Sequence, residues 1–242
     1  MDSRRVFLKK GLGLAGIIAA GEAPASIVKS MIGMHNAMMD GKQLPYKRRL
    51  QWLQFNATDD SLIGCYIDTG IVPNGNQDFS IVFSDFTSRG RWLCGSRIAY
   101  ANNAFGFYTA ANSLNFEATY GNVVLNNSPE FSAFATTNVG QVTFRLDANI
   151  LSASQELGSQ TYGFTFMPQT ISSWNNLVIG GLNNNGSIIS FSVFKFYRAT
   201  ISGLRDYIPV IDWNDVACIY DQITGQLVYN QGTGSFIIGP DK

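Results

Sequence analysis

The chain has 242 residues, of which 45% are hydrophobic and 13% aromatic, so a sizeable core is possible. Only 14% are charged and the formal net charge is zero, which excludes the strongly basic surface of a nucleic-acid-binding protein. The three cysteines, Cys65, Cys94 and Cys218, form no CxxC pair, and this argues against a zinc site. Their odd number leaves two alternatives: three buried thiols, or one disulfide and one thiol.

The first 25 residues have the order of an export signal. Residues 3–9 read SRRVFLK and resemble the twin-arginine motif. A weakly apolar run over 11–20 follows, and the small residues at 23–25 offer a cleavage site. We therefore predict export to the periplasm, the cell surface or the extracellular space.

An uncleaved helical anchor is the alternative for this segment. Apolar residues recur at helical spacing downstream of the signal-like run, at Ile27, Met31, Met34 and Met38. Gly41 then ends the helical pattern. We expect an N-terminal helical segment over 1–42 and a folded domain over 43–242, with membrane contact only through residues 1–42 if they stay attached.

Short segments with a period of two dominate the rest of the chain. Phe79–Ser84, Gln141–Asp147 and Ile189–Val193 each alternate apolar and polar residues, which is typical of half-buried strands. Turn-forming clusters such as 73–76 and 183–186 separate them. The pattern predicts an all-β domain, either a two-sheet sandwich or a barrel.

Two end motifs carry a resemblance to a known group of proteins. Residues 66–73 read YIDTGIVP and look like the opening strand of laminin G-like, concanavalin A-like jelly rolls, which are common in gut bacteria and their phages. The closing stretch 205–240 matches the same group best, from RDYIP through YD to GTGSF and GP. Residues 92–97 and 177–186 are compatible landmarks, whereas the longer insert at 56–64 departs from the pattern.

The resemblance implies two curved antiparallel sheets whose first and last strands are neighbours. It also implies structural roles for the end motifs. Gly70, Gly225 and Gly234 would supply turns with a positive φ. Pro209 would end a strand where no ladder donor is needed, and the carboxylates of Asp68 and Asp221 would cap turns.

Catalysis is not expected. Retaining glycosidases need two carboxyl groups about 5–5.5 Å apart, and glucanases of this fold carry them on a Glu-x-Asp-x-x-Glu run that this chain lacks. Every glutamate is isolated from a second carboxylate at strand spacing: Glu22, Glu117, Glu130 and Glu156. The only histidine is His35, so no Ser-His or Cys-His arrangement occurs in the domain. No cofactor motif is present, although turn Asp and Asn oxygens would suit calcium.

Aromatic and hydrogen-bonding residues of the middle region are the candidate ligand contacts. Sugar rings stack on aromatic side chains, while Asn and Arg bind the hydroxyls. The candidates are Trp92, Arg97, Tyr100, Tyr108, Tyr120, Trp174 and Asn184.

Three functions remain open on this basis. The first is an exported, non-catalytic binding module for a glycan or cell-surface polysaccharide. The second is a phage or prophage virion protein, such as a fibre or capsid decoration at the virion surface. Residues 1–42 would then dock it to other virion or envelope proteins. The third is a divergent glycoside hydrolase.

Overall fold

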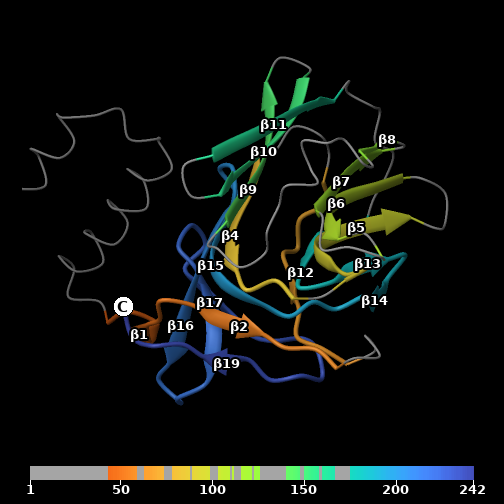
Figure 1. Ribbon diagram of the computed structural model, residues 1–242. Helices are drawn as coiled ribbons and strands as arrows, with labels where there is room; N and C mark the ends of the chain where they lie inside the picture. Colours follow the sequence, from red (N-terminus) through yellow and green to blue (C-terminus); the bar gives the residue numbers. More distant parts are fainter. Residues whose placement is uncertain are drawn as a thin grey trace, which may run out of the picture. The chain divides into compact units, whose positions relative to one another are not determined.

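Figure 1 presents the computed structural model of the chain. It describes residues 43–58, 63–73, 78–87, 89–98, 103–109, 111, 116–121, 123–125, 140–147, 150–157, 160–166 and 175–242. The export motif and the expected N-terminal helix lie outside these ranges. Within them every regular element is a strand, and no described helix has the length and apolarity to cross a membrane.

Eleven strands form what we call the large sheet. Its main path runs in the order β11 (Gln160–Phe166), β10 (Ile150–Leu157), β9 (Gly140–Asp147), β4 (Phe79–Ser84), β15 (Phe194–Ile201), β16 (Arg205–Asp212), β17 (Ala217–Asp221) and β18 (Gln226–Val228). Off this path, β1 (Tyr46–Arg49) pairs with β16, and β2 (Leu53–Phe55) pairs with β15 and with β19 (Ile237–Ile238).

Eight strands form the small sheet. Its path runs through β14 (Ser187–Ile189), β13 (Leu182–Asn184), β5 (Trp92–Ile98), β6 (Asn103–Thr109), β7 (Phe116–Gly121) and β8 (Val123–Leu125). The remaining two strands, β12 (Val178–Ile179) and β3 (Ile67–Asp68), extend it beside β5. Every described pairing in both sheets is antiparallel except that of β13 with β5.

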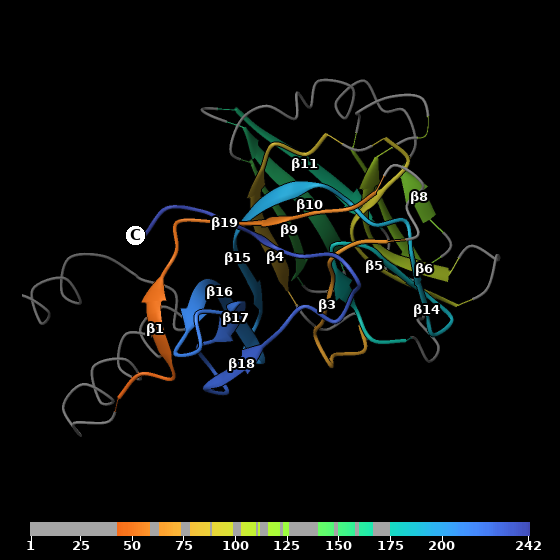
Figure 2. The ribbon, with the colours of Figure 1, turned by 90° about the horizontal axis from the view of Figure 1, so that it is seen from below.

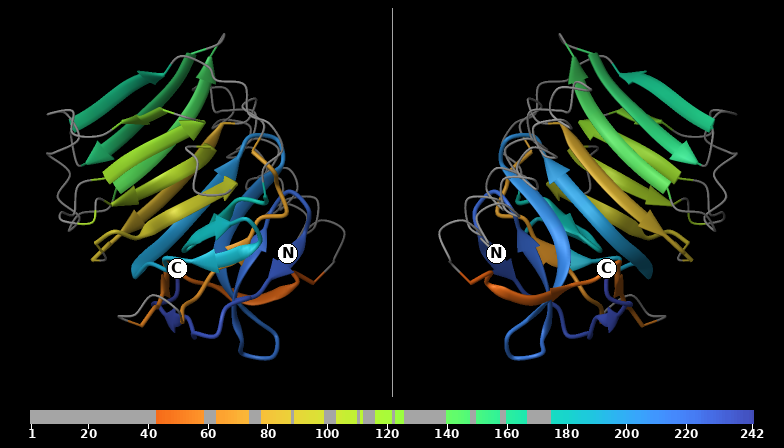
Figure 3. Two further views of the ribbon diagram at one scale, coloured as in Figure 1. Left: turned by 90° about the vertical axis from the view of Figure 1, so that its right-hand side faces the viewer. Right: turned by 90° about the vertical axis from the view of Figure 1, so that its left-hand side faces the viewer.

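The two sheets pack face to face around one apolar core. Figures 1 and 3 show them as two layers, with β4, β9 and β15 in one and β5, β6 and β7 in the other. Both layers contribute side chains to the same cluster, among them Phe79 and Phe196 from the large sheet and Cys94 and Phe107 from the small sheet. The part of the chain that the structure describes is therefore all-β with two sheets, as the alternating segments predict.

Of the three segments with alternating apolar and polar residues, Phe79–Ser84 and Gln141–Asp147 form strands as predicted. Phe79, Ile81 and Phe83 of β4 are buried and face the core, and β9 covers Gln141–Asp147. The third prediction is wrong, because β14 ends at Ile189 and Ser190 has a φ of 56°. A strand needs negative φ, so the chain turns at Ser190 instead of continuing to residue 193.

The opening and closing segments are neighbours, but the last strand pairs with the second strand, whereas the first strand, β1, pairs with β16. Strand β19 pairs with β2, and the N–H of Gln51 donates to the carbonyl of Pro240 at 2.8 Å. Figure 2 shows β2 and β19 running side by side. The opening segment also meets the closing stretch, because the N–H of Tyr66 donates to the side chain of Asn230 at 3.1 Å.

Two predicted structural roles need correction. Gly70 and Gly225 have positive φ as expected, but Gly234 does not. A Cβ on Gly234 would instead come within 3.1 Å of the Gly64 carbonyl carbon, so the glycine is needed for close approach of two backbones.

Pro209 does not end its strand, since β16 continues to Asp212 and Pro209 pairs with Ile219 of β17. The N–H of Leu50, just after β1, donates to the Pro209 carbonyl at 3.0 Å. The N and O of a strand residue point to the same side, so the missing N–H faces β1 rather than the β17 ladder.

Candidate functional site

Four of the seven candidate residues lie on one face of the small sheet. Trp92 and Arg97 come from β5, Tyr108 from β6 and Asn184 from β13. Cys94 and Phe107 face the core, so Arg97 and Tyr108, at odd spacing from them, lie on the outer face, which we define as the face turned away from the core. Trp92 joins them because the register shifts between Trp92 and Cys94, and it packs with Tyr108 apart from the core. Asn184 lies beside Arg97, to which it is hydrogen-bonded. Residues that are distant in sequence are thereby collected on one surface.

Trp92 and Tyr108 form an aromatic pair on this surface. They are partners in the β5–β6 ladder, and their rings stack with centroids 4.6 Å apart and planes at 24°. A Cβ on Gly95 would overlap the Trp92 ring, so glycine allows the indole to lie flat on the strand. Trp92 is only 8% exposed, whereas Tyr108 is half-buried. Tyr108 is therefore the ring of this pair that offers more surface to a ligand.

Trp92 is held in place by segments that the sequence did not connect with it. The backbone N–H of Trp92 donates to the Ser190 carbonyl at 3.2 Å. The backbone carbonyl of Trp92 accepts a hydrogen bond from the buried Ser192 hydroxyl. The positive φ of Ser190 turns the chain toward β5 at this point. A local sequence pattern cannot predict contacts between positions about a hundred residues apart. The sequence therefore gave no sign that Ser190 and Ser192 contact Trp92.

Arg97 and Asn184 form a polar pair on the same surface. The parallel register of β5 and β13 places them side by side, and Arg97 Nε donates to Asn184 Oδ1 at 3.1 Å. The Arg97 carbonyl accepts from Asn185 N at 2.9 Å and from Asn175 Nδ2 at 3.2 Å. Asn175, which sequence analysis did not single out, therefore helps to fix the backbone of this pair.

The turn that carries Asn184 is well defined. Asn183 is buried, donates to the Asn176 carbonyl at 3.0 Å and accepts from the Gly186 N–H at 3.0 Å. Asn185 and Gly186 have φ of 52° and 89°, values that Asn and Gly adopt more readily than other residues. The predicted turn over 183–186 is confirmed, and its geometry directs Asn184 to Arg97.

For the other three candidates the structure gives no side-chain position at this surface. Tyr100 and Trp174 lie outside the described residues. Tyr120 is described only by its backbone, which pairs with Phe105 in the ladder between β6 and β7. Their predicted roles as ligand contacts stay predictions.

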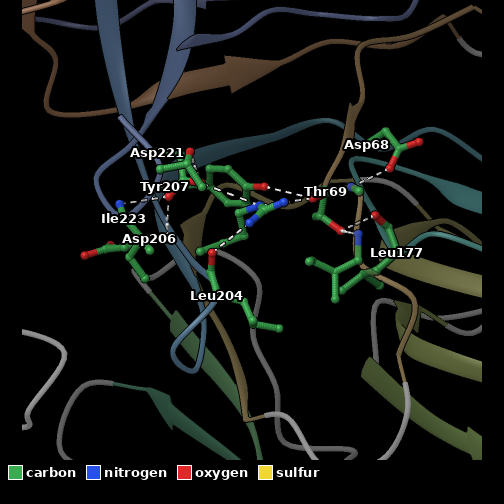
Figure 4. Close-up of polar contacts among 12 residues, drawn as sticks. Asp68, Thr69, Leu177, Leu204, Asp206, Tyr207, Asp221 and Ile223 are labelled. Carbon is green, nitrogen blue, oxygen red and sulfur yellow. Dashed lines mark hydrogen bonds and ion pairs between the residues drawn. The ribbon is translucent and has the colours of Figure 1, made fainter. Parts of the chain in front are cut away.

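A separate polar cluster joins the opening segment to the closing stretch (Figure 4). Asp221 is 1% exposed, and its carboxylate accepts from the N–H groups of Asp206 and Ile223 at 3.0 and 3.1 Å. Asp68 accepts from the Gly70 N–H at 2.8 Å. Both predicted turn caps are therefore confirmed.

Arg205 and Tyr207 complete this cluster. The Arg205 guanidinium lies 3.5 Å from the Asp221 carboxylate, and its Nε donates to the Thr69 carbonyl at 3.2 Å. The Tyr207 hydroxyl donates to the same carbonyl at 3.3 Å, and burial raises its pKa. The cluster is a structural joint, because its carboxylates are occupied by backbone donors and by arginine.

The thiols and carboxylates of the described residues show no metal-binding arrangement. Cys65, Cys94 and Cys218 are all buried free thiols, which decides between the two alternatives left by their number. Burial raises the pKa of both Cys94 and Cys218 to about 12. No group of three His, Cys, Asp or Glu residues converges among the residues that the structure describes.

Comparison with known proteins gives a distant likeness among solved structures. No family model matches the chain, and no curated protein matches it. Among solved structures, the CBM40 of the Ruminococcus gnavus IT-sialidase is similar over 61% of this chain and 90% of that chain, at 13% identity and a TM-score of 0.43. A likeness at this level carries no argument about the ligand of this chain.

Proposed function

We propose that this protein is a non-catalytic binding module that recognises carbohydrate on the outer face of the small sheet. The observation that carries the proposal is the joining of an aromatic pair and an arginine–amide pair on one surface. The half-buried Tyr108 ring suits the C–H face of a sugar. The planar donors of Arg97 and the amide of Asn184 suit its hydroxyl groups.

A finer assignment of the fold belongs to the same proposal. We propose a concanavalin A-like, laminin G-like jelly roll, supported by the residues of the opening and closing motifs. The hydrogen bonds from Tyr66 to Asn230 and from Arg205 to Thr69 support it further, because they join these two motifs.

A glycan array with the full chain tests the binding function. We expect binding to a restricted set of glycans, and titration calorimetry with the best one then compares variants. Arg97→Gln should weaken binding about tenfold or more, because a charged hydrogen-bond partner of the sugar is removed. The matched control is Arg48→Gln, which makes the same change at an exposed position of β1 on the other sheet.

Two results would overturn the proposal. One is silence of the wild-type chain across neutral and acidic glycans. The other is unchanged affinity in Arg97→Gln. Release of reducing sugar from a bound glycan, lost on substitution of one Asp or Glu, would replace the non-catalytic module by a glycoside hydrolase.

Export is proposed for the same protein and is tested separately. The support is the twin-arginine-like run and the small residues at 23–25. Mass spectrometry of the protein recovered from its producing cells should give a mature N-terminus near Ser26. An intact Met1 would reject the export signal and favour an anchoring segment.

A further inference from the structure

Three cationic side chains line up across neighbouring strands of the large sheet. Arg198 lies on β15, Arg49 ends β1, and Lys242 belongs to the segment that follows β19. All three are distant from the arginine–amide pair described above, which is on the other sheet. They make up what we call the cationic row.

The strand register places the members of the row side by side. Ala199 pairs with Tyr207, so Arg198 comes next to Ile208 on β16, and Arg49 pairs with Val210 two positions further along. β15 and β1 thus flank the same edge of β16, one after the other. Beyond β1, the bridge between Leu50 and Asp241 sets Lys242 opposite Arg49, and the Lys242 N–H donates to the Arg49 carbonyl at 3.1 Å.

The row lies on the outer face of the large sheet. Tyr207 and Ile211 of β16 point into the core, so Ile208 and Val210 face the other side. Both are nevertheless fully buried, and the nearby rings of Tyr46 and Tyr220 contact each other at 5.0 Å. The charges of the row therefore lie beside an apolar layer, where their interactions are stronger than in bulk water.

Among the described residues, the carboxylate hydrogen-bonded to this row is that of Asp206, and Arg198 occupies both of its oxygens. Asp206 is 2% exposed and binds Arg198 in bidentate fashion, with both N–O distances at 2.8 Å. Arg49 Nε is buried and has no acceptor within hydrogen-bond distance in the part of the chain that the structure describes. A buried donor without an acceptor is unusual in a folded protein and calls for a partner.

The electrostatics of the row agree with this geometry. Burial is the main cause that lowers the pKa of Arg49, and the positive charge of Arg198 lowers it further, while Tyr46 and Asp206 partly offset this. The positive charge of Arg49 is the main cause that lowers the pKa of Lys242. Adjacent like charges repel each other, so a bound anion would relieve a conflict that the protein itself leaves in place.

We propose that the cationic row binds an oxyanion, a sulfate, phosphate or carboxylate group, between Arg49 and Lys242. Arg49 is only partly buried as a residue, and a small shift of its planar guanidinium would bring Nε and a second nitrogen to two oxygens of the anion. Lys242 would supply a third donor from the neighbouring segment. This site lies on the sheet opposite the proposed glycan surface and does not depend on it.

Titration calorimetry on the full chain tests the site directly. Sodium sulfate, sodium phosphate and sodium acetate are titrated separately at pH 7, with sodium chloride keeping the ionic strength constant. We expect saturable binding of at least one of them to the wild type. Arg49→Gln should weaken it about tenfold or more, since one charge-assisted pair is removed.

Lys242→Gln provides a second variant at an exposed position, in case Arg49→Gln alters folding. It should weaken binding by about threefold to tenfold, as expected for a more exposed charge. Arg48→Gln is the matched control, because Arg48 precedes Arg49 on β1 but is exposed and paired with Asp241 at 2.9 Å. Its affinity should stay within about twofold of the wild type.

The anion that binds most tightly shows which chemical group the site prefers. Tighter binding of sulfate or phosphate indicates a tetrahedral group, and tighter binding of acetate indicates a carboxylate; both support the site. The proposal is overturned if no anion gives saturable binding to the wild type. It is also overturned if Arg48→Gln weakens binding as much as Lys242→Gln does.

Discussion

At the scale of single residues, Asp221 is the side chain with the most demanding position. It accepts hydrogen bonds from the Asp206 and Ile223 N–H groups, and from the Thr224 hydroxyl at 2.7 Å. It also lies beside the Arg205 guanidinium. One buried carboxylate thus caps the β17–β18 turn and holds the start of β16 in place.

Asp221→Ala should lower the free energy of unfolding by about 3 kcal/mol, because it leaves a partly buried arginine and two N–H groups without their acceptor. Urea unfolding followed by circular dichroism measures this change. Asp241→Ala is the matched control, since Asp241 forms an exposed ion pair with Arg48. The control should change stability by no more than about 0.5 kcal/mol. Equal effects of the two substitutions would contradict the structural role of Asp221.

At the scale of elements, β16 is the strand on which the closing part of the fold depends. It pairs with β17 along one edge, and with β15 and then β1 along the other. Its core-facing Tyr207 and Ile211 and the Ile219 of β17 all belong to the apolar cluster between the sheets. The closing stretch is therefore both a set of strands and part of the core.

Deletion of residues 203–242 should abolish cooperative folding, because it removes β16 to β19 and exposes the edges of β15 and β2. The loss of buried Tyr207, Ile211 and Ile219 adds to this effect. Thermal unfolding followed by near-ultraviolet circular dichroism measures the outcome. A truncated protein that melts with the cooperativity of the full chain would reject the closing-strand assignment.

At the scale of the whole molecule, the three cysteines are buried as free thiols and none of them forms a disulfide. The buried thiols stay protonated, since burial raises the pKa of both Cys94 and Cys218 to about 12. In the unfolded chain a thiol ionises near pH 8.5. Between these two values the folded state holds more protons than the unfolded state, so stability falls as pH rises.

We therefore expect the free energy of unfolding to decline above about pH 9, by on the order of 1 kcal/mol per pH unit for each of the two thiols. Urea unfolding at pH 7, 9, 10 and 11 measures the slope. Cys94→Ala should be less stable at pH 7 because it leaves a cavity, but its stability should decline less steeply above pH 9. An identical slope in this variant would show that Cys94 does not cause the decline.

Local sequence patterns were sufficient to predict strands, but they could not predict contacts between residues that are distant in sequence. The alternation in Phe79–Ser84 was sufficient for β4, because its period reflects one buried face. Arg97 and Asn184 were both singled out, but their hydrogen bond depends on the parallel pairing of β13 with β5, which no local pattern encodes. The cationic row depends on register between segments nearly 200 residues apart, and so it was visible only in the structure.

The pairing of β1 with the segment after β19 has a mechanical consequence. Leu50 faces Asp241 in antiparallel register, so Tyr46–Arg49 and Lys242 lie on the same side of this bridge. Tension applied between these two points would peel their hydrogen bonds apart one at a time, like a zipper, rather than shear them together. Pulling at these two segments would therefore load this pair first, before the ladders between the long strands of the large sheet.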